Sequence, residues 1–262
     1  EADWRAPKCV STTAPSRFSR PSARRPSRIG EAVSGTGWFL LRAPFAAFRW
    51  MQAGSYRATS PVIPPSAAWG LLLNLASIET RGSVNETSTP IRDDAPPLRI
   101  AIGVPAMCSA ARVASLYQQL HGYPVGADAG KEFREGTRGS KYAISPARRE
   151  ILVDFSCVVG VESMHAGLEG RLDAPRYGLP FAGDNNLLFD RIDALDAAPH
   201  CHWYEAIDLN GGPRAGSCRL TVGIDRADSS RTTSALYAPT SGSSPAPPEA
   251  AWSWVPGVPE GK

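Results

Sequence analysis

Proline is the residue that most limits how this chain can fold, because it occupies 24 of the 262 positions. That is close to twice the usual share of about 5%. Proline has no backbone N–H and keeps the residue before it extended, so it interrupts helices. We therefore expect few helices and many loops and extended segments, in one large domain or two small ones.

The clearest helical pattern begins at Ser66, directly after a pair of prolines. Ser66 is a candidate N-cap, since its hydroxyl can accept a hydrogen bond from the first turn. The apolar residues that follow at i, i+3, i+4 and i+7 are Trp69, Leu72, Leu73 and Ala76. Further leucines widen this stripe, which predicts a helix packed deeply against a sheet.

Four segments have the apolar runs or alternating patterns of β-strands, namely residues 38–41, 98–104, 148–160 and 220–224. A polar, glycine-rich stretch between the second and third segments predicts a long excursion from the sheet. The order of these elements favours an α+β fold in which a helix lies on a mostly antiparallel sheet.

Two further expectations concern the second half of the chain. Residues 166–172 are predicted to form a short helix. From Asp225 onwards serine, threonine, proline and alanine dominate, which predicts an irregular tail in which Trp252 and Trp254 are candidate anchors to the body.

Positive charge is concentrated near the start of the predicted fold. Between Ala32 and Ile78 there are three arginines and no acidic residue, although the net charge of the whole chain is only +3. Phe48, Trp50 and Tyr56 lie among these arginines, which are Arg42, Arg49 and Arg57. A basic field beside aromatic rings suits a polyanion with bases that can stack. The backbone N–H groups of the helix start are a further candidate phosphate site.

The remaining composition excludes several classes of protein. Residues 1–34 contain seven Arg or Lys against three acids and are expected to be a disordered or non-native basic arm, in a chain that begins with Glu1. Five irregularly spaced cysteines argue against a disulfide framework and favour a cytoplasmic setting. No apolar run reaches the roughly 18 residues of a membrane span.

The sequence offers little catalytic chemistry. His200-Cys201-His202 has no second pair of ligands at a zinc spacing, so we expect no metal and no cofactor. A metal-independent ribonuclease needs only an acid, a base and a cation, which His121, Lys141 and Tyr142 can supply. Simple packing of His121 at the base of the excursion is the alternative that we favour.

Five segments together resemble the fifth CRISPR-associated (Cas) protein family, in its DevS-like branch. They occur in the family's order over residues 37–192, with weaker similarity in APPEAAWSWV near the end. The segments are RAPFAAFRW, SYRATSPVIPPSAAWGLL, LYQQLHGYPVG, GSKYAISPARREILVDF and RYGLPFAGDNNLLFDRI.

The resemblance implies a ferredoxin-like, RRM-like RAMP domain over residues 35–192, with an antiparallel sheet and a long thumb-like β excursion at about residues 110–145. Residues 193–262 would form a small C-terminal extension and tail. Family members bind the 5′ handle of crRNA and cap one end of a type I Cascade surveillance complex. They contact its backbone subunit and its large subunit, and the complex binds target DNA.

Carried onto this chain, the resemblance implies a set of RNA-binding residues without a catalytic centre. They are Arg49, Tyr56, Arg57, Ser66, Gln118, Gln119, Lys131, Arg134, Lys141 and Arg148. We expect a binding subunit and not an enzyme. A crRNA-processing endoribonuclease and a protein-only scaffold remain the alternatives.

Overall fold

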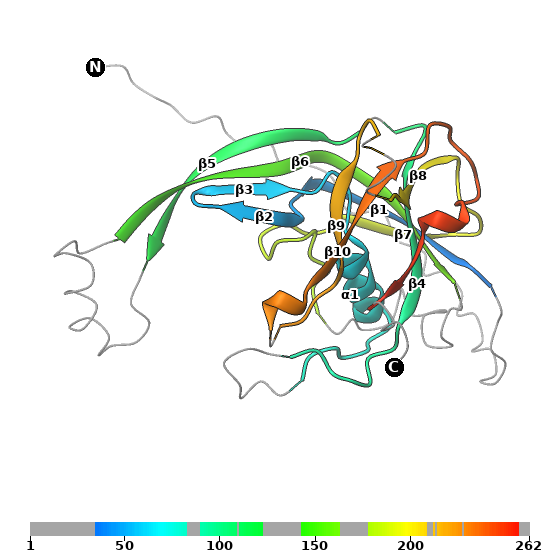
Figure 1. The fold of residues 1–262 in the computed structure, drawn as a ribbon, viewed down its shortest axis with the longest axis horizontal. Helices are drawn as coiled ribbons and strands as arrows, with labels where there is room; N and C mark the ends of the chain where they lie inside the picture. The colour runs from blue at the N-terminus through cyan, green and yellow to red at the C-terminus, as the bar shows by residue number, and fades with distance from the viewer. Residues whose placement is uncertain are drawn as a thin grey trace, which may run out of the picture. The chain divides into compact units, whose positions relative to one another are not determined.

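The strand β6 (Ala143–Glu162) organises the sheet, because other strands pair with both of its edges (Figure 1). One edge pairs with β1 (Gly37–Ala46) and then with β3 (Tyr56–Thr59). The other edge pairs with β4 (Leu98–Pro105) and then with β5 (Arg112–Gly122). The pairing with β3 is parallel, and the other three are antiparallel.

The computed structural model describes residues 35–82, 90–108, 110–122, 143–162, 178–208, 212, 214–226 and 228–256. They all belong to one unit of the chain, residues 32–262. Across these ranges no helix has the length and the apolar composition needed to span a membrane. The predicted helix at residues 166–172 and the basic arm at residues 1–34 lie outside the described residues.

The sheet has eleven strands and is antiparallel except at the β3–β6 pairing. Around its centre the strand order is β7-β1-β6-β4, and β4 continues to β8, β10 and β9. The additional strands are β7 (Arg191–Leu195), β8 (Cys201–Ala206), β9 (Cys218–Gly223), β10 (Thr233–Pro239) and β11 (Trp252–Val255). The structure therefore confirms the expectation of a mostly antiparallel sheet with a helix.

The helix α1 (Pro65–Leu75) packs on the sheet as its apolar stripe predicts, because Trp69, Leu72 and Leu73 are buried in the main core. The predicted cap is wrong. Pro64 is the N-cap residue, no side chain caps the helix, and Ser66 is a buried residue of the first turn. Proline suits the first helical position because its missing N–H needs no partner there.

The apolar run at the start of β1 is explained by burial on both faces of the strand. Phe39 and Leu41 belong to the core beneath α1, while Trp38 and Leu40 pack against a second cluster around Trp203. A strand that is covered on both sides needs no polar alternation, and this is why the sequence predicts it well.

The stretch that contains Arg49, Arg57 and the aromatic residues between them forms a β-hairpin, which the sequence did not predict. β2 (Arg49–Ala53) and β3 are antiparallel and are joined by a tight turn at Gly54, whose φ is +56°. The prediction of an irregular tail is also wrong, because β10 and β11 pair with β8, β9 and β4. Trp252 does anchor this part of the chain, since its ring lies 6.1 Å from that of Trp38.

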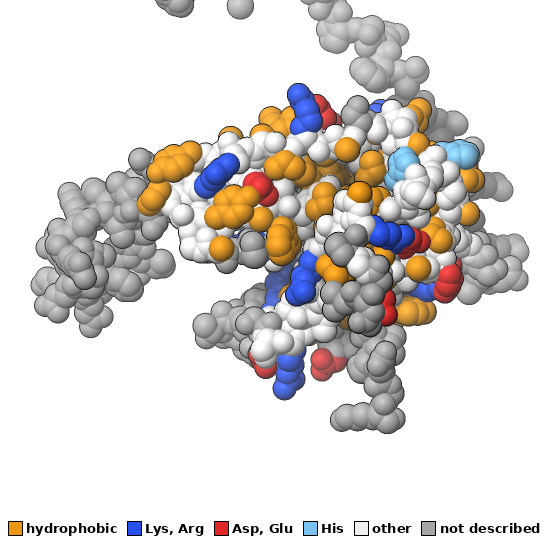
Figure 2. Space-filling view, turned by 45° about the horizontal axis from the view of Figure 1, so that its top comes forward, with side chains coloured by type: hydrophobic (Ala, Val, Ile, Leu, Met, Phe, Trp, Pro, Cys, Tyr) orange, Lys and Arg blue, Asp and Glu red, His pale blue; other side chains and the backbone are white. Residues whose placement is uncertain are grey.

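The predicted excursion begins and ends as a two-stranded ribbon. β5 pairs with the first half of β6 from Arg112↔Val153 to Gly122↔Ala143. Residues 123–142, between the two strands, lie outside the described residues. Figure 2 shows hydrophobic side chains on the surface of this ribbon, where Val113, Leu116 and Tyr117 are exposed.

Candidate nucleic-acid interface

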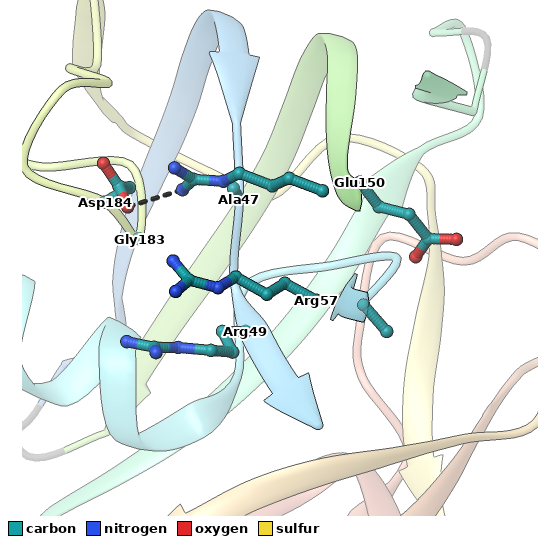
Figure 3. A pocket seen from close by; sticks show the side chains of 8 residues that line it. Ala47, Arg49, Arg57, Glu150, Gly183 and Asp184 are labelled. Atoms are coloured by element: carbon teal, nitrogen blue, oxygen red, sulfur yellow. Dashed lines mark hydrogen bonds and ion pairs between the residues drawn. The ribbon is translucent and has the colours of Figure 1, made fainter. Parts of the chain in front are cut away.

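Three arginines from three strands meet in one small pocket, which we call the arginine pocket (Figure 3). Arg49 comes from β2, Arg57 from β3 and Arg149 from β6. The pocket is completed by Ala47, Ala58, Glu150, Gly183 and Asp184. Its volume is about 40 Å³, far below the roughly 300–1,000 Å³ of small-molecule sites. The space suits a single anionic group such as a phosphate.

Strand pairing positions the three arginines. β3 runs parallel to β6 with Arg57 directly beside Arg149, so their side chains share one face of the sheet. Arg49 pairs with Thr59 at the other end of the β2–β3 hairpin. Figure 3 shows the guanidinium groups of Arg49 and Arg57 pointing to the same side of the strands, toward the turn that carries Asp184.

The fourth side of the pocket is a tight turn that precedes β7. The backbone N–H of Ala47 donates to the carbonyl of Ala182 at 2.9 Å. Gly183 follows with a φ of +86°, and a Cβ atom there would lie 2.3 Å from the carbonyl oxygen of Ala47. Only glycine fits this close approach of two backbones. This contact between the two backbones therefore positions Asp184 at the edge of the pocket.

Asp184 is the carboxylate that the arginines surround. Its side chain forms an ion pair of 2.5 Å with Arg149 and accepts a hydrogen bond from the N–H of Asn186 at 3.0 Å. Burial raises the pKa of the Asp184 carboxyl, but Asn186, Arg149 and Arg49 together lower it below its ordinary value. Asp184 is therefore ionised at neutral pH, and three guanidinium groups face one negative charge.

Glu150 does not neutralise the pocket, because its carboxylate is held on the other side. One of its oxygens accepts the hydroxyl of Tyr56 and the other accepts the N–H of Thr59 at 3.1 Å. Figure 3 shows the Glu150 carboxylate directed away from Arg49 and Arg57. The hydrogen bond to Glu150 raises the pKa of the Tyr56 hydroxyl. The field inside the pocket is consequently positive.

Of the RNA-binding residues expected from the sequence, the structure brings Arg49 and Arg57 together. Tyr56 and Arg148 form a separate pair, in which the Arg148 guanidinium lies 5.9 Å from the centre of the Tyr56 ring. Arg148 precedes Arg149 in β6, so it points to the opposite face of the strand. It is exposed there and does not line the arginine pocket.

The other expected residues lie elsewhere. Ser66 is 8% exposed and belongs to a helix start whose first residues are mostly buried, so it offers neither its hydroxyl nor that turn to a phosphate. Gln118 is half-buried in β5. The side chains of Gln119 and His121, and residues Lys131, Arg134, Lys141 and Tyr142, lie outside what the structure describes.

Two pocket residues were missed by the sequence reasoning. The residues expected from the sequence include Arg148 but not its neighbour Arg149. Strand alternation allows only one of two neighbouring arginines to face a given side. Asp184 lies in a turn, and nothing local in the sequence shows that this turn lies beside β6.

Comparison with known proteins identifies the fold. No family model matches the sequence, and no curated protein matches it. One chain of a CRISPR RNA-guided surveillance complex is similar in structure, with a TM-score of 0.54 and 17% identity over 81% of this chain and 92% of that one. A Cas protein is 16% identical over 79% and 94%, with a TM-score of 0.42. This chain therefore shares its fold with a protein of a CRISPR RNA-guided surveillance complex.

Proposed function

We propose that this protein is a non-catalytic subunit of a type I CRISPR Cascade complex, where it binds the 5′ handle of the crRNA and caps one end of the assembly. The arginine pocket is the observation that carries this proposal. The fold shared with a chain of a CRISPR RNA-guided surveillance complex supports it independently, as do the five sequence segments that resemble the DevS-like branch.

The strand order supports a ferredoxin-like RAMP domain. In a ferredoxin-like fold the chain runs β-α-β-β-α-β. Here β1, α1, β4, β6 and β7 occur in this order along the chain, with β2 and β3 inserted before α1 and β5 inserted before β6. The central order β7-β1-β6-β4 is antiparallel throughout. The fold has its second helix between the strands that correspond to β6 and β7, and residues 163–177 of that connection lie outside the described residues.

The arginine pocket suits a phosphate of a single-stranded RNA. Arginine presents a planar fork of donors that matches two phosphate oxygens. Arg57 forms no ion pair with any carboxylate in the part of the chain that the structure describes. A phosphate beside Arg57 would satisfy this charge, while Asp184 keeps Arg149 in place.

Under the same proposal, the protein is cytoplasmic and contacts the backbone subunit and the large subunit of the complex. It meets target DNA through the complex. The β5–β6 ribbon corresponds to the thumb. Its exposed Val113, Leu116 and Tyr117 suit contact with another subunit of such a complex.

The experiment that tests the proposal measures RNA affinity as a function of salt concentration. The RNA carries the 5′ handle from the CRISPR repeat encoded beside the gene. Arg57→Ala should weaken binding and reduce the salt slope by about 0.7, the value for one phosphate contact on a single strand. Arg42→Ala is the control, because Arg42 is an exposed arginine of β1 outside the pocket.

Equal affinities of Arg57→Ala and Arg42→Ala at every salt concentration would refute the proposal.

The processing alternative is tested by incubating the protein with repeat RNA in chelator. Specific cleavage that is lost in His121→Ala would make the protein an endoribonuclease. Assembly into the complex without any RNA would support the protein-only scaffold.

A further inference from the structure

A second, larger groove lies between the β2–β3 hairpin and the strands β9 and β10. Its volume is about 310 Å³, and it is lined by Trp50, Arg219, Thr221, Thr232 and Ser234. This volume reaches the lower end of the range of about 300–1,000 Å³ for organic ligands. The groove is therefore large enough for a ring system and not merely for a single anionic group. We call it the Trp50 groove.

One wall of the Trp50 groove is the polar face of the β9–β10 hairpin. Arg219 and Thr221 alternate in β9 with Leu220, which is fully buried against the core. Ser234 lies directly across from Thr221 in β10. This face presents one guanidinium and several hydroxyl groups, which can donate to and accept from the edge of a polar ring. None of the ion pairs among the described residues involves Arg219.

The other wall is the indole of Trp50, which is 42% exposed. The register of β2 against β3 shifts between Arg49 and Met51, so Trp50 is the extra residue of a β-bulge. Bulges change the direction of a side chain and are common beside functional sites. Arg49 lines the arginine pocket, and the next residue, Trp50, lines the Trp50 groove.

We propose that the Trp50 groove is a nucleobase site. An unpaired base of the RNA whose phosphate occupies the arginine pocket stacks on the Trp50 indole, and Arg219, Thr221 and Ser234 contact its edge and backbone. This inference rests on the proposed RNA-binding function and adds a second contact point to it. Aromatic stacking accepts any base, because every base has a flat π-face.

The position of β2 allows one RNA strand to reach both sites. β2 is the terminal strand in the path of the sheet, so no further strand formed by the described residues covers its outer edge. Arg49 and Trp50 are consecutive, and their Cα atoms are therefore about 3.8 Å apart. A nucleotide whose phosphate is bound beside Arg49 thus carries its own base, or that of its neighbour, past the edge of β2 toward Trp50.

The experiment uses the intact protein and the handle RNA with 2-aminopurine at one position at a time, because stacking quenches the emission of this base. One position should be quenched by the wild type but not by Trp50→Ala. Removing a stacking ring should also weaken binding by about tenfold. Trp254→Ala is the matched control, since Trp254 is 46% exposed in β11 and does not line the groove.

An abasic nucleotide at the quenched position completes the test. It should weaken binding to the wild type by the same factor and should have no further effect on Trp50→Ala. Trp50→Phe keeps a flat ring and should retain most of the quenching. If Trp50→Ala unfolds, Trp50→Leu takes its place, because it keeps an apolar side chain without a flat ring and should lose the quenching.

The outcomes separate this inference from the proposed function. If Arg57→Ala weakens binding while Trp50→Ala equals Trp254→Ala, the arginine pocket binds RNA and the nucleobase site is refuted. A protein partner is then the occupant of the groove if Trp50→Ala blocks assembly of the complex. If the wild type does not bind handle RNA at all, both proposals are wrong.

Discussion

Arg149 and Asp184 form an ion pair of 2.5 Å although they lie 35 positions apart in the chain. Arg149 belongs to the central strand, and Asp184 belongs to the turn before β7. The pair ties this turn to the strand that lies beside Arg57. It also fixes Arg149 in the pocket before any ligand arrives, which reduces the entropy lost on binding an anion.

Asp184→Asn tests this role through the pH dependence of stability. The folded pKa of Asp184 is depressed, so its contribution is fully present above the unfolded pKa near 3.8 and is lost as the pH falls through the folded value. At pH 7 the variant should unfold with a free energy lower by about 1.5–3 kcal/mol, the value of a hydrogen bond to a charged group. Urea unfolding from pH 7 to pH 3 should show this difference shrinking toward zero.

The control for that series is Asp190→Asn, which removes a carboxylate from an exposed residue near the same turn. It should change stability little at any pH. A difference between wild type and Asp184→Asn that stays constant down to pH 3 would contradict the assigned role of the ion pair.

Gly183→Ala tests the backbone geometry that delivers Asp184. A φ of +86° is strained for alanine, and its Cβ would lie 2.3 Å from the carbonyl oxygen of Ala47 and 2.7 Å from the ring of Phe48. We expect a loss of at least about 2 kcal/mol, measured as a lower Tm. Gly242→Ala is the control, because nothing lies within 4 Å of a Cβ at that position. Equal Tm values for the two variants would contradict the prediction.

The sequence predicts those parts of the fold that depend on local patterns. The apolar stripe of α1 and the runs in β1 and β4 identify these elements, since each carries its own buried face. The sequence of the β2–β3 hairpin has no such apolar pattern, and the hairpin depends on the pairing of β3 with β6. Its turn at Gly54 was the one local signal that could have revealed it. Similarly, the serine- and proline-rich composition after Asp225 hides β10 and β11, because their pairing partners lie in distant parts of the chain.

The residues of the candidate site also fall into those that local sequence predicts and those that it does not. Arg49 and Arg57 are predictable from the absence of acidic residues around them. Arg149 and Asp184 are not, because their place in the pocket depends on a parallel strand pairing and on a long-range turn contact. Amino-acid composition thus predicts the positive charge of the site but not the residues that fix its geometry.

Tyr56→Phe separates a structural role of Tyr56 from the RNA contact expected from the sequence. The Tyr56 hydroxyl donates to Glu150, whose carboxylate is directed away from the arginine pocket. Loss of this hydrogen bond should lower the free energy of unfolding. The affinity for handle RNA and its salt dependence should stay at the wild-type values. A reduced affinity without a change in stability would instead make the hydroxyl an RNA ligand.

Trp252→Ala tests whether the last strand is an integral part of the sheet. β11 pairs with β4, and the half-buried Trp252 ring lies 6.1 Å from that of Trp38 and 5.7 Å from the guanidinium of Arg99. Replacing a fully buried tryptophan by alanine lowers the free energy of unfolding by about 3–5 kcal/mol. Trp252 is only half-buried, so chemical denaturation should show a decrease of roughly 2 kcal/mol. Trp254→Ala removes a more exposed ring from the same strand and should cost less than about 0.5 kcal/mol. If both variants were equally stable, Trp252 would not be the residue that anchors β11.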